Sequence, residues 1–167
     1  MKNKVKTYIL MLSKVFPVGH PRAGQPTDFK TKKAEGVKKH TIRGNVELWE
    51  HRAEEINAGR AVLSVRQWSG KPYEPGSHQI EIARHTRLHT QRISIPYEWH
   101  PTLQVFLPAS QVTILTKEKE AKVVKTADVA ANDGLSIIDF RHWFASRKKQ
   151  VPFNRQGIIL HFTESVY

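Results

Sequence analysis

The sequence contains no cysteine. This absence excludes disulfide bonds, thiolate zinc sites and cysteine nucleophiles, and it is compatible with a cytosolic compartment. Long apolar runs are also missing, since none approaches the roughly 20 residues of a membrane span. The apolar patch at 7–12 follows a basic start but is too short for a signal peptide, so we interpret it as a first core strand. We therefore expect a cytoplasmic protein without a membrane partner.

Acidic residues are few compared with basic ones. Lys and Arg number 27 and Asp and Glu 15, which gives a net charge of +12 at neutral pH. The basic residues are spread along the chain and are not confined to a tail. Such an excess attracts polyanions at long range, and phosphate contacts supply most non-specific affinity for nucleic acids. The charge favours RNA or a nucleoside as partner; the alternative is a basic surface that serves solubility alone.

The length and the hydrophobic pattern predict one α+β domain over residues 1–167. We predict strands at 5–12, 40–43, 61–68, 79–83, 112–116 and 157–163, and helices at 29–35, 45–58, 126–131 and 137–144. Two shorter strands are expected at 91–95 and 103–107, separated by a turn between Pro96 and Pro101. The charged stretch 117–122 is expected to be solvated. This alternation of short strands and helices is typical of a small, curved sheet or barrel.

The pattern Gly36-x-Lys38-x-x-Thr41-x-Arg43 connects residue spacing with chemistry. Gly36 stands where a helix C-terminus favours a left-handed residue. In the strand that follows, Thr41 and Arg43 point to one face and Ile42 to the other, so a hydroxyl and a guanidinium lie side by side. Lys38 falls at the corner between helix and strand, from which it can turn toward Thr41.

This stretch resembles the G-x-K-x-x-[TE]-x-R signature of the ASCH domains, which belong to the PUA-like barrels. The resemblance implies a PUA-like small β-barrel, with a mixed, curved sheet and peripheral helices. Compact bacterial members hydrolyse the acetyl amide of N(4)-acetylcytidine with a Lys, a Thr and a Glu. The resemblance assigns these roles to Lys38, Thr41 and Asp133, which precedes a short helix and the last strand. Asp replaces Glu here, and the segments near 45–58 and 84–108 depart from the family as insertions.

The implied chemistry is coherent. A threonine hydroxyl is a poor nucleophile until a base takes its proton, and Lys38 can do so if burial or nearby cations depress its pKa. A protonated Lys38 would instead stabilise an oxyanion. Asp133 would orient the lysine or a water, while Arg43 and Lys39 are candidates for binding the substrate. The alternative is an ordinary strand Thr41 beside a solvated Lys38. No metal or cofactor is expected.

A second candidate surface lies around the turn that follows the strand at 61–68. Arg66, Trp68, Lys71 and Tyr73 place two aromatic rings among two cations, a combination that holds single-stranded nucleic acid by stacking and phosphate contact. The alternative is a hairpin whose Trp68 closes the end of a barrel. The pair His85 and His89 has metal-ligand spacing only if helical, so solvated or phosphate-facing histidines are preferred.

Three functions follow as hypotheses. The first is a hydrolase acting on N(4)-acylated cytidine or a related modified nucleoside, the second a non-catalytic RNA-binding module that uses the same cleft, and the third a ribonuclease. Convergence of Lys38, Thr41 and Asp133 would favour the enzyme. An Asp133 that only caps the helix after Ser136 would argue against it.

Overall fold

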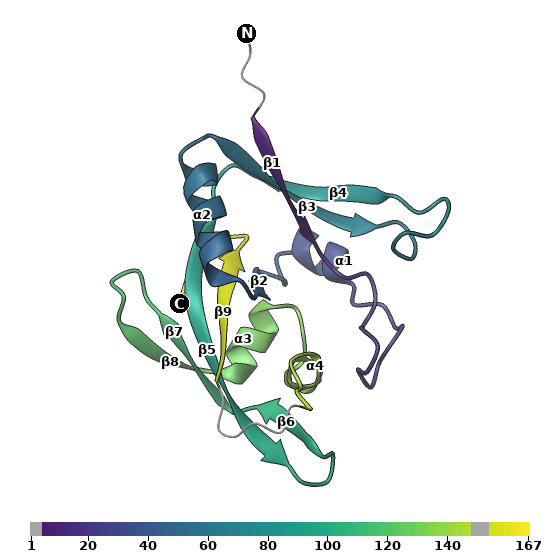
Figure 1. The fold of residues 1–167 in the computed structure, drawn as a ribbon, viewed down its shortest axis with the longest axis vertical. Coiled ribbons are helices and arrows are strands. Elements are labelled where there is room, and N and C mark those ends of the chain that lie inside the picture. Colours follow the sequence, from purple (N-terminus) through teal and green to yellow (C-terminus); the bar gives the residue numbers. More distant parts are fainter. Residues whose placement is uncertain (1–4, 148–153) are drawn as a thin grey trace.

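The computed structural model describes residues 5–147 and 154–167, which form nine strands and four helices. A three-stranded sheet has the order β1 (Lys6–Met11), β3 (Ala61–Trp68), β4 (Gln79–His85). Strand β1 runs parallel to β3, and β4 is antiparallel to it. This sheet lies across the upper part of the molecule in Figure 1.

The larger sheet has the order β2-β9-β5-β7-β8, and β6 pairs with β5. Its strands are antiparallel neighbours: β2 (His40–Arg43), β5 (His89–His100), β6 (Val105–Pro108), β7 (Gln111–Leu115), β8 (Ala121–Lys125) and β9 (Asn154–His161). The α+β prediction is thus confirmed, with two mostly antiparallel sheets. Among the described strands we find no closed barrel.

The four helices are α1 (Phe29–Ala34), α2 (Val46–Asn57), α3 (Thr126–Asn132) and α4 (Ile137–Trp143). Helix α2 contacts strands of both sheets, and Trp49, Ala53 and Ile56 on one of its faces are buried. Helix α3 contacts α4 and β8 (Figure 1). One continuous cluster of buried apolar side chains therefore connects the two sheets through the helices. No helix in the described part of the chain is both long and apolar enough to cross a membrane.

The predicted break between 91–95 and 103–107 is wrong. Strand β5 runs without interruption through Pro96, and the turn comes only after His100. Proline removes one ladder hydrogen bond, which usually ends a strand. Pro96 is tolerated because β5 changes partners there: Pro96 is opposite Asn154 of β9, and Tyr97 is already opposite Pro108 of β6.

The charged stretch 117–122, which was expected to be solvated, forms a tight turn and the start of a paired strand. Its first residues form a tight turn, in which Lys119 has a positive φ of 61° and the Thr116 amide donates to Glu120 over 2.9 Å. The chain then enters β8, which pairs with β7. Side chains of β8 are mostly exposed, as the charge predicted, but the backbone is paired.

Candidate functional site

The candidate site begins where helix α1 ends. Gly36 has a φ of 74°, as predicted, and the Val37 and Lys38 amides both donate to the Lys32 carbonyl, over 2.8 and 2.9 Å. The left-handed glycine reverses the chain direction. The next amide, that of Lys39, donates to the Asn132 carbonyl over 2.7 Å and joins this corner to the end of α3. Lys38 is thereby fixed between α1 and β2.

The Lys38 side chain turns inward and meets Asp133. Its Nζ lies 2.6 Å from Asp133 Oδ1 and 2.7 Å from the Asp133 carbonyl oxygen. The two side chains are only 1% and 6% exposed. Nζ also lies over the Phe29 ring, 4.0 Å from its centroid. The ammonium is thus held by two oxygens and one aromatic face, all of them buried.

Asp133 occupies this position because α3 ends in the same way as α1. Gly134 has a φ of 77°, and the Leu135 amide donates back to the Ala130 carbonyl over 3.0 Å. Asp133 does not cap α4, because Ser136 does: its Oγ accepts from the Asp139 amide over 3.0 Å. Asp133 also reaches Lys38, at 2.6 Å, although its side chain is shorter than that of the Glu in the family pattern.

Burial dominates the electrostatics of this pair. It lowers the pKa of Lys38, while attraction to Asp133 acts in the opposite direction. Burial raises the pKa of Asp133, opposed by Lys38 and then by Arg43. Each shift favours the neutral form of its group, so moving the proton from lysine to aspartate costs less free energy than between solvated partners.

Thr41 and Arg43 share one face of β2, as alternation predicted, and Ile42 enters the core. Arg43 Nη1 donates to Thr41 Oγ1 over 3.0 Å, and its Nη2 donates to the Met11 carbonyl over 2.7 Å. In the described part of the chain, the Thr41 hydroxyl has no hydrogen bond with Lys38 or Asp133. It accepts from arginine, which leaves its own proton available for donation.

Sequence reasoning missed a second buried group beside Asp133. His40 Nδ1 lies 3.8 Å from Asp133 Oδ1 without a hydrogen-bond partner, and His40 Nε2 is 2.9 Å from the Tyr167 hydroxyl. Asn132 Nδ2 donates to the same hydroxyl over 2.8 Å. Burial lowers the pKa of His40 well below its usual value, so the ring is neutral at physiological pH. The sequence analysis gave His40 no role, and no sequence signal linked Tyr167 to this corner.

The remaining predicted binding residues lie in three places. Lys39 is exposed beside the site. Trp68, Lys71 and Tyr73 line a cavity of about 700 Å³ whose other wall is formed by residues 11–18. Arg66 is not among its lining residues: it donates to Ser64 Oγ within β3 and to Gln79 of β4.

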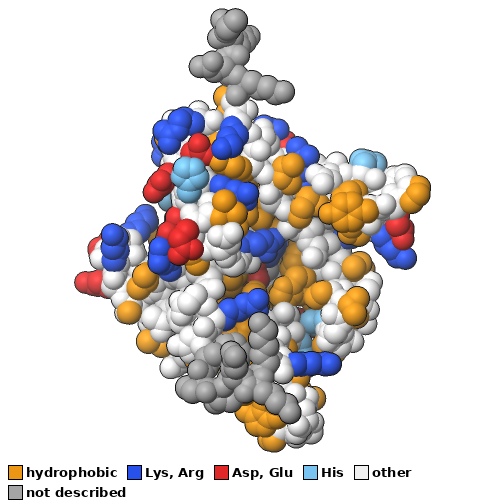
Figure 2. Space-filling view, in the orientation of Figure 1, with side chains coloured by type: hydrophobic (Ala, Val, Ile, Leu, Met, Phe, Trp, Pro, Cys, Tyr) orange, Lys and Arg blue, Asp and Glu red, His pale blue; other side chains and the backbone are white. Residues whose placement is uncertain are grey.

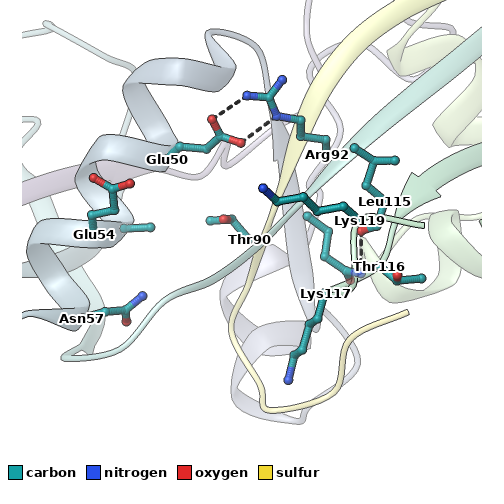
Figure 3. Close-up of a pocket in the computed structure, with 11 residues that line it drawn as sticks. Glu50, Glu54, Asn57, Thr90, Arg92, Leu115, Thr116, Lys117 and Lys119 are labelled. Atoms are coloured by element: carbon teal, nitrogen blue, oxygen red, sulfur yellow. Dashed lines mark hydrogen bonds and ion pairs between the residues drawn. The ribbon is translucent and has the colours of Figure 1, made fainter. Parts of the chain in front are cut away.

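Two further cavities lie away from Lys38. One of about 660 Å³ separates α2 from the β7–β8 turn; Figure 3 shows Glu50 and Arg92 paired at its edge, with Lys117 and Lys119 opposite the helix. Another of about 410 Å³ lies beside His20 and Trp143. None of the three cavities is lined by Lys38, Thr41 or Asp133.

The predicted histidine pair is not helical. His85 ends β4 and His89 begins β5, and His89 lies 3.1 Å from Glu164. Among residues 5–147 and 154–167, no cluster of three or more His, Asp or Glu side chains has an arrangement suited to a metal ion.

No protein-family model matches this chain, and neither a curated protein nor a solved structure gives a significant match.

Proposed function

We propose that this chain is an ASCH-like protein with a PUA-like fold that binds RNA or a nucleoside and hydrolyses the amide of N(4)-acylated cytidine or a related modified nucleoside. One observation carries the proposal. Lys38 and Asp133, which are 95 residues apart in the sequence, form a buried ion pair of 2.6 Å at the corner from which the Thr41 strand begins. The positive charge of the chain agrees with a nucleic-acid partner.

The proposed hydrolysis begins with the proton that Lys38 and Asp133 share in their ion pair. Lys38 passes its proton to Asp133, and the neutral amine takes the proton of the Thr41 hydroxyl as its oxygen attacks the acyl carbon. The Arg43 guanidinium, which donates to Thr41 Oγ1, would stabilise the negative charge that develops on the former carbonyl oxygen of the acyl group. The C–N bond then breaks as the Lys38 ammonium passes the proton of Thr41 to the departing cytosine amine. Water attacks the acyl ester with Lys38 again as base, which releases the acyl group as a carboxylic acid and restores the Thr41 hydroxyl. Asp133 finally returns its proton to Lys38. Among these four residues Arg43 keeps partial exposure, so the substrate would enter from its side.

The test is to incubate the purified protein with N(4)-acetylcytidine and to follow the release of cytidine and acetate. We expect Lys38→Ala and Thr41→Val to reduce turnover by about a hundredfold or more. Lys30→Ala, which removes an exposed lysine from α1, is the matched control. Circular dichroism and thermal unfolding of each variant separate loss of chemistry from loss of fold.

A non-catalytic RNA-binding module is the second candidate, favoured by the hydrogen bond that Thr41 makes with Arg43 and not with Lys38. In that case the wild-type protein would show no turnover, and salt-dependent RNA binding would survive Lys38→Ala. This combination of results would overturn the hydrolase. We propose no ribonuclease activity, because no contact in the site favours it over these two.

A further inference from the structure

The cavity of about 700 Å³ between residues 11–18 and the β3–β4 hairpin is not part of the hydrolytic chemistry. Leu12, Val15 and Val18 form one wall, and Trp68, Pro72 and Tyr73 the other. Figure 2 shows hydrophobic side chains gathered on this face around the hairpin and the hollow beneath it. Val18 is 100% and Tyr73 89% exposed. Exposed apolar side chains that gather in one place are typical of interaction sites.

The aromatic residues of this wall form a pair. The Trp68 and Tyr73 ring centroids lie 5.0 Å apart, and their planes are inclined by 58°. Tyr73 has a φ of 64°, a left-handed conformation that L side chains rarely adopt. Its ring is therefore held in solvent at a steric cost, which is a feature of residues positioned for contact.

The opposite wall is preformed. The Phe16 amide donates to the Gln25 carbonyl over 2.9 Å, and the Thr27 hydroxyl donates to the Ser13 carbonyl over 2.7 Å. Lys14 Nζ donates to the Ser69 carbonyl and connects this loop with the hairpin. Hydrogen bonds within the loop, and one from the loop to the hairpin, thus hold this wall in place.

The cavity is lined by two lysines and lies close to the candidate site. Lys14 and Lys71 line the cavity, and the Lys71 side chain is 82% exposed, with Glu74 3.3 Å away. Met11 also lines the cavity, and its carbonyl accepts from the Arg43 guanidinium that donates to Thr41. The Arg43 side chain therefore connects the wall of the cavity at Met11 with Thr41 of the candidate site.

We infer that this cavity binds an unpaired base of single-stranded RNA, next to the nucleotide at Thr41, by stacking on Trp68 and Tyr73. The inference rests on the proposed function, since it takes nucleic acid as the substrate. The bases of a duplex are already stacked and cannot enter, whereas every unpaired base offers a π-face to an aromatic pair. Lys14 and Lys71 contact the adjoining phosphates.

The experiment measures binding of a fluorescein-labelled, ten-nucleotide RNA of mixed sequence, single-stranded and as a duplex, by fluorescence anisotropy. The RNA carries no acylated base, so its binding is independent of hydrolysis. We expect Trp68→Ala and Tyr73→Gly each to weaken single-strand binding about fivefold or more. Trp68→Phe should retain most of the affinity but lose the quenching of tryptophan fluorescence that RNA causes.

The controls use the chain itself. Trp99→Ala removes another surface tryptophan, 41% exposed and paired with Phe106 at 4.9 Å, and should leave the affinity unchanged. Tyr73→Gly suits the left-handed backbone, so its thermal stability should not fall.

Unchanged RNA affinity in both Trp68→Ala and Tyr73→Gly would overturn the inference. So would equal affinity for single strand and duplex. If Trp68→Ala instead abolished a wild-type dimer seen by analytical ultracentrifugation, with RNA affinity intact, the cavity would bind a second copy of the chain. Failure of N(4)-acetylcytidine hydrolysis with stacking-dependent RNA binding would overturn the hydrolase and leave this subsite standing.

Discussion

The Lys38–Asp133 pair buries a cation and an anion almost completely, with side-chain exposures of 1% and 6%. Removing charges from water is costly, and their attraction repays it only when the geometry is good and the remaining hydrogen bonds are made. Here the second oxygen for Lys38 is the Asp133 carbonyl at the end of α3, where the helix dipole favours a positive charge. Lys32 Nζ donates nearby to the Gly134 carbonyl over 2.9 Å. The helix end and the carboxylate therefore act together on one ammonium group.

A double-mutant cycle measures this coupling. We expect Lys38→Met to lower the free energy of unfolding by about 3–5 kcal/mol, because it leaves Asp133 buried without its partner. Lys38→Met with Asp133→Asn should cost clearly less than the sum of the single changes. Urea unfolding provides the measurement. The exposed Lys71–Glu74 pair is the control, and its removal should cost at most about 1 kcal/mol. Additive effects at Lys38 and Asp133 would contradict a direct pair.

Buried histidine makes the stability depend on pH. Burial, and then the charge of His89, lower the pKa of His161 to about 4 from an ordinary 6.5. Between pH 6.5 and pH 4, His161 is protonated in the unfolded chain but neutral in the folded chain. The free energy of unfolding therefore falls as the pH falls from 6.5 toward 4. For His161 alone the loss approaches about 3 kcal/mol.

His161→Phe should flatten this dependence in urea titrations performed from pH 7 to pH 4. A His161→Phe curve parallel to the wild-type curve would show that other groups cause the acid sensitivity.

At the scale of elements, the site is the meeting point of two helix C-termini. Helices α1 and α3 both end in a left-handed glycine, Gly36 with a φ of 74° and Gly134 with a φ of 77°. Their surroundings differ. A Cβ at Gly36 would meet open space, whereas a Cβ at Gly134 would lie 3.1 Å from Lys38 Cβ. The glycine beside Asp133 thus allows both the backbone turn and the close approach of the lysine.

This difference gives a matched pair of variants. Gly36→Ala should cost about 1 kcal/mol, the penalty of a left-handed alanine. Gly134→Ala should cost more, and it should also displace Lys38 and reduce any hydrolysis of N(4)-acetylcytidine. Thermal unfolding and activity of both variants check this. Equal losses of stability would show that the backbone conformation alone matters at Gly134.

The sequence predicted the parts of this site that local rules control. The helix end at Gly36, the corner at Lys38 and the shared face of Thr41 and Arg43 follow from glycine chemistry and strand alternation, and the structure has all of them. Asp133 came from the family resemblance, and the structure brings it to Lys38. That contact is not evident from spacing, since it depends on the tertiary fold.

Other features depended on long-range contacts and could not be predicted. The path of β5 through Pro96 depends on a change of partner strands, which no local pattern records. Tyr167 reaches His40 because its amide donates to Gln91 Oε1 of β5 over 2.9 Å. The aromatic hairpin at Trp68 was predicted as a binding surface, but its opposite wall at 11–18 appeared only in the structure.

At the scale of the whole molecule, the net charge of +12 has a measurable consequence. Binding of single-stranded RNA releases counterions, so the logarithm of the affinity should fall linearly with the logarithm of the salt concentration, by about 0.7 per phosphate contacted. Lys71→Ala should reduce this slope by about that amount. Trp68→Ala should weaken binding without changing the slope, because stacking is not ionic. Titrations at several salt concentrations test both, and affinity independent of salt would contradict an electrostatic contribution.

The separation of 95 residues between Lys38 and Asp133 also bears on how the chain folds. Within the described sheet, β2 has β9 as its strand neighbour, and Arg43 is opposite Ile158. Contacts between such distant segments require the closure of long loops and slow the folding reaction. During synthesis, Lys38 has no acidic partner until α3 has left the ribosome, and Thr41 stands on an unpaired strand until β9 follows. The site is therefore completed among the last parts of the fold, so partly folded chains have neither the ion pair nor any activity that depends on it.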